Sequence, residues 1–396
     1  MSTATAIPNA ADMVGDKLVC KLCGAAEHSI KLHLSKSHPG ISEADYLAQF
    51  PGAPLLSPMA QKALDARQAQ ASAATPAAAP VMGAGKKAFH EIFDLGTAPA
   101  AMSANGKPIM ITTCAIKPEA TPFIPEIDLD YVFNVDVLKN VVMAMEMNIP
   151  TYVWGHAGTG KTTLYNQVAA RTGRAVLRVQ HTANMEEDQI VGGWRVRNGE
   201  TFFELGPLAV AMLNGWTYIA DEYDFGRPEV LSVYQAVLEG APLFIKEADA
   251  KNRIIRPHAD FRLLATGNTN GQGDESGLYG GTNMQNAANF ERFGVVQQMP
   301  WMEPETEARV ISRKARIPLD DAKKLVDFAK RVREEFDGQK MSNPISPRSL
   351  IYAGKLGIAR KDYRIGLELA FLNRLTATDR EAASQLAQRT FVAGAK

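Results

Sequence analysis

The sequence of 396 residues has little cysteine, no long apolar run and no excess charge of either sign. Its three cysteines are too few for a disulfide framework, and two of them, Cys20 and Cys23, are spaced like metal ligands. No apolar run reaches the roughly 18 residues that a membrane-spanning helix needs. The N-terminal residues have neither a basic region nor an apolar core, so no secretory signal is recognisable. These absences predict a cytoplasmic protein without a membrane segment.

The formal net charge is zero, because 43 basic side chains balance 43 acidic ones. This balance argues against a chain that is basic throughout, as a general nucleic-acid coat protein would be. The charge is nevertheless uneven along the chain. Residues 1–120 carry 10 basic and 9 acidic side chains, residues 121–302 carry 14 and 21, and residues 303–396 carry 19 and 13. An acidic middle and a basic end suit copies of one chain that pack against each other.

Composition divides the chain into five expected parts. Residues 1–58 hold the cysteine pair, and residues 59–88 are rich in Ala, Gln and Pro, which predicts a flexible linker because little apolar surface can be buried there. Residues 89–120 are expected to be an arm on the next domain. In residues 121–302 short apolar strands alternate with helices, which predicts an α/β domain with a parallel sheet, and residues 303–396 are helical throughout. The expected strands are Thr151–Trp154, Ala175–Gln180, Thr217–Ala220, Phe261–Thr266 and Val295–Met299.

The most specific motif directly follows the first of these strands. It runs Gly155-His156-Ala157-Gly158-Thr159-Gly160-Lys161-Thr162, with Thr163 next, and fits the pattern G-x-x-x-x-G-K-[ST] between a strand and a helix. Glycines let backbone N–H groups curl around phosphate oxygens, and the N-terminus of the following helix points at them. We expect Lys161 to reach the β- and γ-phosphates and the Thr162 hydroxyl to ligate Mg²⁺. The motif therefore predicts a nucleotide site, and the alternative is a chance glycine-rich turn.

Polar residues also end two other expected strands. Asp221 and Glu222 follow Thr217–Ala220, and Asn268 follows Phe261–Thr266. Since ligands of open α/β sheets bind at the carboxyl ends of the strands, Asp221 is expected on the Mg²⁺ side and Glu222 as the base that polarises the attacking water. Asn268 is positioned to hydrogen-bond that water or the γ-phosphate. The alternative is a solvated acidic turn and an ordinary loop.

Two arginines come later in the chain. Arg292 lies between an expected helix and the last strand, and Arg348 opens a helix behind the N-cap Ser346 and Pro347. A surface arginine is usually a solvated charge, so each is weak evidence alone.

In this order the motifs resemble an AAA+ ATPase with a helical lid, and more narrowly the MoxR branch and the ATPase subunits of aerobic cobaltochelatases. The narrower resemblance rests on Pro125-Glu126-Ile127-Asp128, Gly158-Thr159-Gly160-Lys161, Asp221-Glu222-Tyr223-Asp224, Gly226-Arg227-Pro228, Arg253 to Pro257, and Gly277-Leu278-Tyr279 before Thr282. It covers residues 89–396.

The resemblance implies roles for these residues. Lys161 and Thr162 look like the Walker A pair, Asp221 and Glu222 like the Walker B pair, and Asn268 like sensor 1. Arg292 looks like an arginine finger inserted into a neighbouring subunit, Arg348 like sensor 2, and Arg227 like a further contact between subunits. ATP and Mg²⁺ are the implied cofactors, and a homohexamer with sites between subunits is the implied assembly.

Two insertions look like working parts. Residues 191–203 indicate a hairpin about Asn198-Gly199, which resembles the MoxR-type insertion that faces a pore or partner. Residues 243–255 indicate a second hairpin that turns near Asp249–Asn252. The alternative is a pair of edge hairpins whose aromatic residues pack into the core.

The N-terminal part has the pattern Cys20-x₂-Cys23-x₉-His33-x₄-His38, which predicts a Zn²⁺ site, with His28 as a spare ligand. Free thiols beside unrelated histidines are the alternative. The spacing is similar to the Ros/MucR-type zinc finger, which implies DNA binding. However, only Lys21, Lys31 and Lys36 lie nearby, so docking of a partner or a structural role is equally open.

Three functions follow from these patterns. The first is a MoxR-type motor that remodels a partner protein, expected to carry a von Willebrand A domain. The second is the ATPase subunit of a cobalt or magnesium chelatase, and the third is a regulator directed to DNA by the zinc finger.

Overall fold

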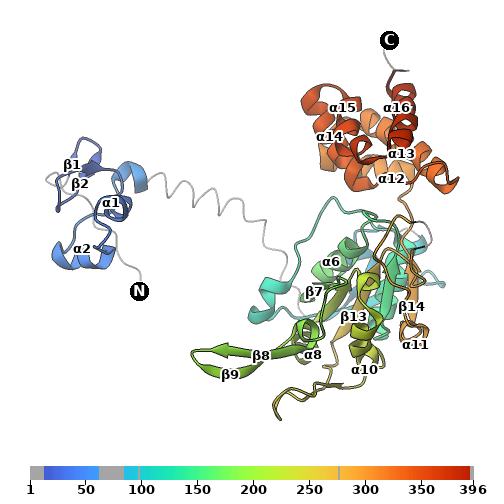
Figure 1. Cartoon of the computed structure of the whole chain (residues 1–396), viewed down its shortest axis with the longest axis horizontal. Coiled ribbons are helices and arrows are strands. Elements are labelled where there is room, and N and C mark those ends of the chain that lie inside the picture. The colour runs from blue at the N-terminus through green and yellow to red at the C-terminus, as the bar shows by residue number, and fades with distance from the viewer. Residues whose placement is uncertain (1–12, 62–83, 97–98, 275–276, 393–396) are drawn as a thin grey trace. The chain divides into compact units, whose positions relative to one another are not determined.

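The computed structural model describes residues 13–61, 84–96, 99–274 and 277–392 (Figure 1). The chain divides into two compact units, Met1–Val81 and Met82–Lys396. Most of the segment expected to be a linker, residues 62–83, lies outside the described residues. The end of that segment is ordered, because Gly85–Ala88 forms strand β4, which pairs with strand β5 (Met110–Thr113).

The first unit is a small antiparallel sheet followed by two helices. Its elements are β1 (Met13–Val14), β2 (Lys17–Val19), β3 (Ala26–Glu27), α1 (Ile30–Ser37) and α2 (Glu43–Gln49). Helix α2 begins at a capping box, in which Ser42 and Asp45 satisfy each other's backbone N–H groups. A single small apolar cluster forms the core, with Leu18, Cys20, Ile30, Leu34, Tyr46 and Ala53 buried.

The second unit is built on a five-stranded parallel sheet with the order β14-β6-β13-β10-β7. The five strands are β6 (Thr151–Trp154), β7 (Val176–Gln180), β10 (Thr217–Asp221), β13 (Arg262–Gly267) and β14 (Val295–Gln298). All five predicted strands are confirmed within one residue at each end. This order brings the chain after β6 beside the ends of β10 and β13.

Both faces of the sheet are covered, because successive residues of a strand point to opposite sides. On β6, Tyr152 belongs to the apolar cluster that includes helix α8 (Pro207–Asn214). The next residue, Val153, belongs to the cluster that includes α5 (Val135–Glu146) and α6 (Lys161–Thr172). The sheet is therefore the middle of three layers.

Two hairpins extend from this body. Strands β8 (Gly192–Arg197) and β9 (Glu200–Leu205) pair antiparallel about Asn198-Gly199, as predicted, and Figure 1 shows them as a projecting ribbon. Phe203 is buried, whereas Trp194 is half exposed. Phe203 packs into the core, as the alternative of an edge hairpin expects, whereas its cross-strand partner Trp194 does so only in part, so both interpretations of this hairpin stay predictions. Strands β11 (Leu243–Phe244) and β12 (Ile254–Ile255) form the second hairpin, with a turn between Asp249 and Asn252.

The C-terminal helices form a bundle with its own apolar core. They are α12 (Pro304–Ala315), α13 (Leu319–Asp337), α14 (Pro347–Arg360), α15 (Tyr363–Ala370) and α16 (Ala377–Val392). As predicted, the Ser346 side chain caps α14 by accepting a hydrogen bond from Ser349 N. Within the bundle, Arg333 and Glu307 form a buried bidentate pair.

Short helices complete the described part of the chain. They are α4 (Phe89–Ile92), η2 (Pro99–Ala101), η3 (Pro118–Phe123), α7 (Asp188–Val191), η4 (Tyr223–Phe225), α9 (Pro228–Leu231), η5 (Ser232–Tyr234), α10 (Gln235–Leu238), α11 (Ala287–Phe290) and η6 (Leu372–Arg374). None of the described helices combines the length and apolar character that crossing a membrane requires.

Candidate functional site

The glycine motif forms a tight loop between β6 and α6. Gly155 has φ of 151°, and a Cβ there would lie 2.5 Å from the carbonyl oxygen of Met299, so only glycine fits. Gly160, with φ of 94°, caps the start of α6 in the left-handed region. The loop therefore delivers Lys161 and Thr162 on the first turn of a helix, where free backbone N–H groups favour an anion.

Lys161 is buried at the base of this loop. Its Nζ donates hydrogen bonds to Gly155 O at 2.7 Å, His156 O at 3.0 Å and Asn268 Oδ1 at 3.1 Å. Burial lowers the pKa of Lys161 to about 8, opposed by the negative charges of Asp224, Asp221 and Glu222. The ammonium is thus held between the loop and the end of β13.

The Asp221 carboxylate is buried and receives hydrogen bonds on both oxygens. Thr162 Oγ1 and Thr266 Oγ1 each donate to Oδ1 at 2.6 Å. Arg178 donates to Oδ2 through Nε at 2.8 Å and also through Nη2. The predicted pair of Thr162 and Asp221 is therefore in direct contact, and a hydroxyl beside a carboxylate is a donor set that suits Mg²⁺ with its bound water.

Glu222 follows with an unusual backbone conformation. Its φ of 52° and ψ of 42° lie in the left-handed region, which costs a non-glycine residue about 1–3 kcal/mol. Its backbone N donates to Thr266 Oγ1 at 3.1 Å, and its Oε2 accepts from Gln180 Nε2 at 2.6 Å. The strained turn and Gln180 together orient the carboxylate beside Asp221.

Asn268 is fixed by a second buried acid, Asp224. Asp224 Oδ2 accepts from Asn268 N at 2.8 Å, Thr269 N at 2.8 Å and Thr269 Oγ1 at 3.0 Å. Burial raises the pKa of Asp224, and its Oδ1 has no hydrogen-bond partner among the described residues. Asp224 therefore anchors the loop that presents the Asn268 side chain to Lys161.

These side chains line one cavity of about 360 Å³, here called the P-loop cavity. Arg348 reaches it from α14. The predicted site residues that meet there are Ala157, Gly158, Gly160, Lys161, Thr162, Thr163, Asp221, Glu222, Asn268 and Arg348. Gly155 closes the start of the loop, and Thr159 faces a neighbouring cavity. His156 instead stacks on Trp301, with ring centroids 4.9 Å apart, and burial lowers its pKa.

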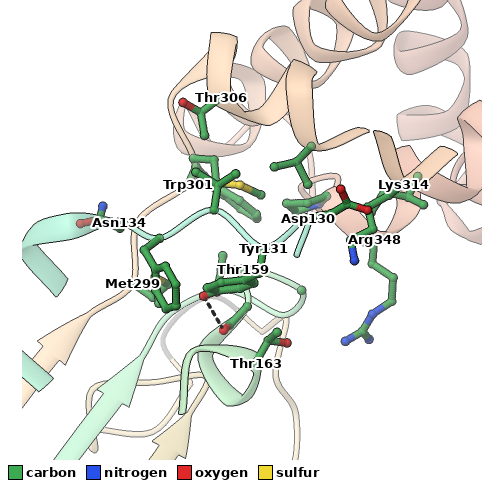
Figure 2. A pocket seen from close by; sticks show the side chains of 18 of the residues that line it. Asp130, Tyr131, Asn134, Thr159, Thr163, Met299, Trp301, Thr306, Lys314 and Arg348 are labelled. Atoms are coloured by element: carbon green, nitrogen blue, oxygen red, sulfur yellow. Dashed lines mark hydrogen bonds between the residues drawn. The ribbon is translucent and has the colours of Figure 1, made fainter. Parts of the chain in front are cut away.

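The neighbouring cavity, here called the lid cavity, has a volume of about 630 Å³ and lies between the loop and the C-terminal helices. Figure 2 shows Tyr131 and Thr159 on one side of it and Trp301, Thr306 and Lys314 on the other. The lid cavity and the P-loop cavity share Gly158, Gly160, Thr163 and Arg348. A cavity lined by aromatic, apolar and charged side chains beside the glycine loop has room for a nucleoside.

Two predicted arginines do not reach the P-loop cavity. Arg292 Nε donates to Glu239 Oε1 at 2.6 Å, and Arg227 Nη2 donates to Glu186 Oε1 at 2.8 Å. Neither lines the P-loop cavity of its own chain. The structure therefore leaves both outside the cluster that the other predicted residues form.

Sequence reasoning missed Arg178, Gln180 and Thr266. Arg178 and Gln180 lie two residues apart on β7, so both point to the same face of the sheet. The register pairs Gln180 with Asp221, which places both side chains at the end of β10. The sequence shows that Arg178 and Gln180 are two residues apart in an expected strand. It does not show that this strand lies beside β10.

The first unit contains a separate cluster of Cys20, Cys23, His33 and His38. Their ligand atoms all lie within 4.8 Å of one another, and Cys23 Sγ is 3.1 Å from His33 Nε2. His38 Nε2 is buried without a hydrogen-bond partner among the described residues. His28 was expected as a spare ligand, but it is turned to Ser57 Oγ at 3.0 Å and lies outside the cluster. Two thiols and two imidazoles aimed at one point are a donor set for Zn²⁺.

Comparison with known proteins gives matches to both parts of the second unit. The family described as AAA domain (dynein-related subfamily) matches residues 150–279, and the family described as CbbQ/NirQ/NorQ C-terminal matches residues 307–390. The aerobic cobaltochelatase subunit CobS of Sinorhizobium sp is 32% identical over 279 residues, which cover 68% of this chain and 83% of that protein.

Two further relatives are more distant. Protein CbbQ of Hydrogenophilus thermoluteolus is 26% identical over 221 residues, covering 56% of this chain and 79% of that protein. Protein NorQ of Paracoccus denitrificans is 25% identical over 229 residues, covering 58% and 81%. The strands of the P-loop cavity and the C-terminal helices thus both have counterparts in named families.

Proposed function

The chain belongs to the MoxR-type AAA+ ATPases, whose activity is ATP hydrolysis, and we propose that it is a ring motor that uses this activity to remodel a partner protein. The observation that carries the proposal is the P-loop cavity, where Lys161, the adjacent Asp221 and Glu222, and Asn268 converge from three separate segments. The adjoining lid cavity supplies space for the nucleoside.

The geometry supports a role for each residue. The loop N–H groups and Lys161 would bind the phosphates, and Thr162 with Asp221 would hold Mg²⁺, which would supply positive charge to the phosphate groups. Glu222 polarises the attacking water, and Gln180 keeps its carboxylate in place. Asn268, anchored by Asp224, and Arg348 complete the contacts to the γ-phosphate.

The position of Arg292 supports the proposal of a ring. Arg292 lies outside its own P-loop cavity on the turn after α11, paired with Glu239. An arginine supplied by a neighbouring subunit contributes on the order of 10³–10⁵ in rate for P-loop enzymes. A homohexamer in which Arg292 enters the next subunit's site would make hydrolysis depend on assembly. The acidic residues 121–302 and basic residues 303–396 favour such packing.

For the partner, we propose a protein with a von Willebrand A domain, contacted by the projecting β8–β9 hairpin. Val196 is 72% exposed and Trp194 is 50% exposed on this hairpin, so apolar surface is available there. A narrower possibility is an ATPase subunit of a cobaltochelatase, which the similarity to CobS favours.

For the first unit, we propose a structural Zn²⁺ held by Cys20, Cys23, His33 and His38. The converging ligand atoms and the unpartnered His38 Nε2 support it. Residues 13–61 carry four lysines and four acidic side chains, so no basic excess supports DNA binding. A cytoplasmic location and a DNA partner both stay predictions from the sequence.

The central test is Glu222→Gln in the full chain. We expect ATP hydrolysis to fall by about 10²–10⁴-fold, because the water loses its base, while nucleotide binding persists. Glu229→Gln, an exposed residue on α9, is the matched control and should hydrolyse ATP like the wild type. Unchanged turnover in Glu222→Gln would remove Glu222 from its role. The stalled variant should also retain its partner in a pull-down.

The ring is tested separately with Arg292→Ala. We expect low hydrolysis in the pure variant and partial recovery when it is mixed with Glu222→Gln subunits, which supply the arginine. Light scattering with a non-hydrolysable ATP analogue should show a hexamer. A wild-type protein that stays monomeric under these conditions contradicts the ring.

A further inference from the structure

The counter-charge of Asp221 comes from a residue that none of the recognised motifs contains. Asp221 is 2% exposed, and burying a carboxylate is costly unless it is paired. Thr162 and Thr266 occupy Oδ1 with neutral hydroxyls, so they satisfy hydrogen bonds but supply no charge. The positive charge in contact with Oδ2 is the guanidinium of Arg178.

Strand β7 fixes this arrangement. It lies beside β10 in the parallel sheet, with Arg178 opposite Ile219 and Gln180 opposite Asp221. Arg178 and Gln180 therefore approach the two Walker B carboxylates from the same side, one to each. Arg178 also lines the P-loop cavity, together with Lys161 and Arg348, and 47% of its side chain is exposed.

We propose that Arg178 is a positioning residue that neutralises Asp221 until Mg²⁺ arrives with the nucleotide, and so sets how strongly nucleotide binding depends on Mg²⁺. The proposal rests on the phosphate site proposed above. Without the metal, Arg178 stops the Asp221 charge from repelling the phosphates. With the metal, Mg²⁺ itself balances Asp221, and the guanidinium is no longer required there.

The consequence is a difference between two affinities. If Arg178 is replaced by Met, the cavity loses one positive charge and exposes the phosphates to an unpaired carboxylate. Binding without Mg²⁺ should therefore weaken strongly. Binding with Mg²⁺ should weaken much less, since the freed Asp221 can interact fully with the hydrated ion.

The experiment measures the affinity of the full-length protein for ADP by calorimetry, once with excess Mg²⁺ and once with EDTA. The quantity compared is the ratio of the Kd in EDTA to the Kd in Mg²⁺. We expect this ratio to rise about tenfold in Arg178→Met, equivalent to about 1.4 kcal/mol. Arg178→Lys retains the charge and should stay close to the wild-type ratio. Arg331→Met is the matched control, because Arg331 is 45% exposed and paired with Asp327 on α13.

Each outcome decides between explanations. An unchanged ratio in Arg178→Met overturns the proposal. If the ratio is unchanged because both affinities fall equally, Arg178 is a direct phosphate ligand. An equal rise in Arg178→Met and Arg178→Lys also overturns the proposal, since charge would not be the cause. Wild-type protein that binds no ADP under either condition would instead contradict the phosphate site itself. Thermal unfolding of each variant confirms that the chain is folded.

Discussion

The two units of the chain position their polar side chains by different means. In the ATPase unit, Asp221 is fixed by Thr162, Thr266 and Arg178, so the protein itself supplies every contact. In the N-terminal unit, His38 Nε2 is buried without a partner among the described residues, although three other ligand atoms lie around it. The first site is preorganised by its own hydrogen bonds, whereas the second is the cluster for which we propose a metal.

The apolar core of the ATPase unit is also much larger than that of the N-terminal unit. The ATPase unit has a large cluster on each face of its sheet and a third in the C-terminal helices. The described residues of the N-terminal unit form one cluster, in which six residues are buried. A segment with so little buried apolar surface needs another source of folding free energy, and a structural metal is a common one. We therefore expect the N-terminal unit to unfold when a metal ligand is lost, and the ATPase unit to be destabilised when its apolar core is truncated.

The largest effect is expected from Cys20→Ser. Structural Zn²⁺ contributes roughly 10–16 kcal/mol to zinc-finger peptides, so losing one ligand should leave residues 13–61 unfolded. We expect the full chain to lose its bound zinc, measured by atomic absorption, and residues 13–61 to become sensitive to protease. ATP hydrolysis per chain should stay within about twofold, since additivity holds for independent sites.

Cys114→Ser is the control for this change, because Cys114 is outside the metal cluster. It should keep one zinc per chain and the protease resistance of the wild type. A Cys20→Ser protein that retains both properties would remove the metal from its proposed role and leave the small apolar cluster as the support of the fold.

The next largest effect is expected from Leu138→Ala, which perturbs the ATPase unit and leaves the N-terminal unit unchanged. Leu138 on α5 is 0% exposed in the cluster beneath the sheet. The cavity should lower the free energy of unfolding of this unit by about 2–5 kcal/mol, measured by urea denaturation. Leu129→Ala is the control, since Leu129 is 83% exposed and its truncation should change stability by less than about 0.5 kcal/mol. Zinc content should be unchanged in both variants, and its loss in Leu138→Ala would contradict independent units.

The same contrast explains how far the sequence alone could lead. The strands were predictable because each is a short apolar run with a turn at its end, and Lys161 and Thr162 were predictable because their motif is contiguous. Such signals are local. The contact of Cys20, Cys23, His33 and His38 was equally foreseeable, because their spacing within 19 residues limits how far apart they can lie.

The residues that were missed depend on contacts between distant strands. Arg178 could be assigned only after β7 was known to lie beside β10 in the sheet. In the sequence, Asp224 stands out only as one residue of the stretch Asp221-Glu222-Tyr223-Asp224. Its function as an anchor depends on the return of the chain along β13 to Thr269, 45 residues later. Arg292 illustrates another limit, since its proposed target lies in a second copy of the chain.

A smaller effect is expected at Asp224. Asp224→Ala removes the acceptor of three hydrogen bonds from the Asn268–Thr269 loop and should cost about 1–3 kcal/mol of stability, with slower ATP hydrolysis. Asp224→Asn keeps one acceptor oxygen and should cost less than Asp224→Ala. Equal losses in both variants, measured by urea unfolding, would show that the negative charge matters more than the acceptor.

The pH dependence of these variants has a definite sign. Burial raises the pKa of Asp224, so the folded protein holds this proton to a higher pH than the unfolded chain does. Wild-type stability therefore declines, through this group, as pH rises from about 4 through the raised pKa. Asp224→Asn lacks this titration, so its stability relative to wild type should improve from pH 4.5 to pH 7. If the stability of Asp224→Asn relative to wild type falls over this range, the pKa of the buried Asp224 carboxyl is not raised.

The smallest effect is expected from Lys314→Met at the lid cavity. Lys314 Nζ lies 2.5 Å from Asp128 Oδ2 and joins α12 to the segment before α5, but both side chains are about one-third exposed. Solvent screens such a pair, so its loss should lower the free energy of unfolding by no more than about 1 kcal/mol.

Because Lys314 also lines the lid cavity, ADP affinity should weaken by a fewfold at low salt, and the difference should shrink as salt is added. Lys324→Met removes a similar pair with Asp321 outside this cavity and should leave ADP affinity unchanged. Equal effects of the two variants on ADP binding would show that the Lys314–Asp128 pair acts on the nucleotide only as general surface charge. If only Lys314→Met weakens ADP binding, the Lys314–Asp128 pair itself helps to shape the nucleotide site. The residues that preorganise this site would then include the contact between α12 and the segment before α5.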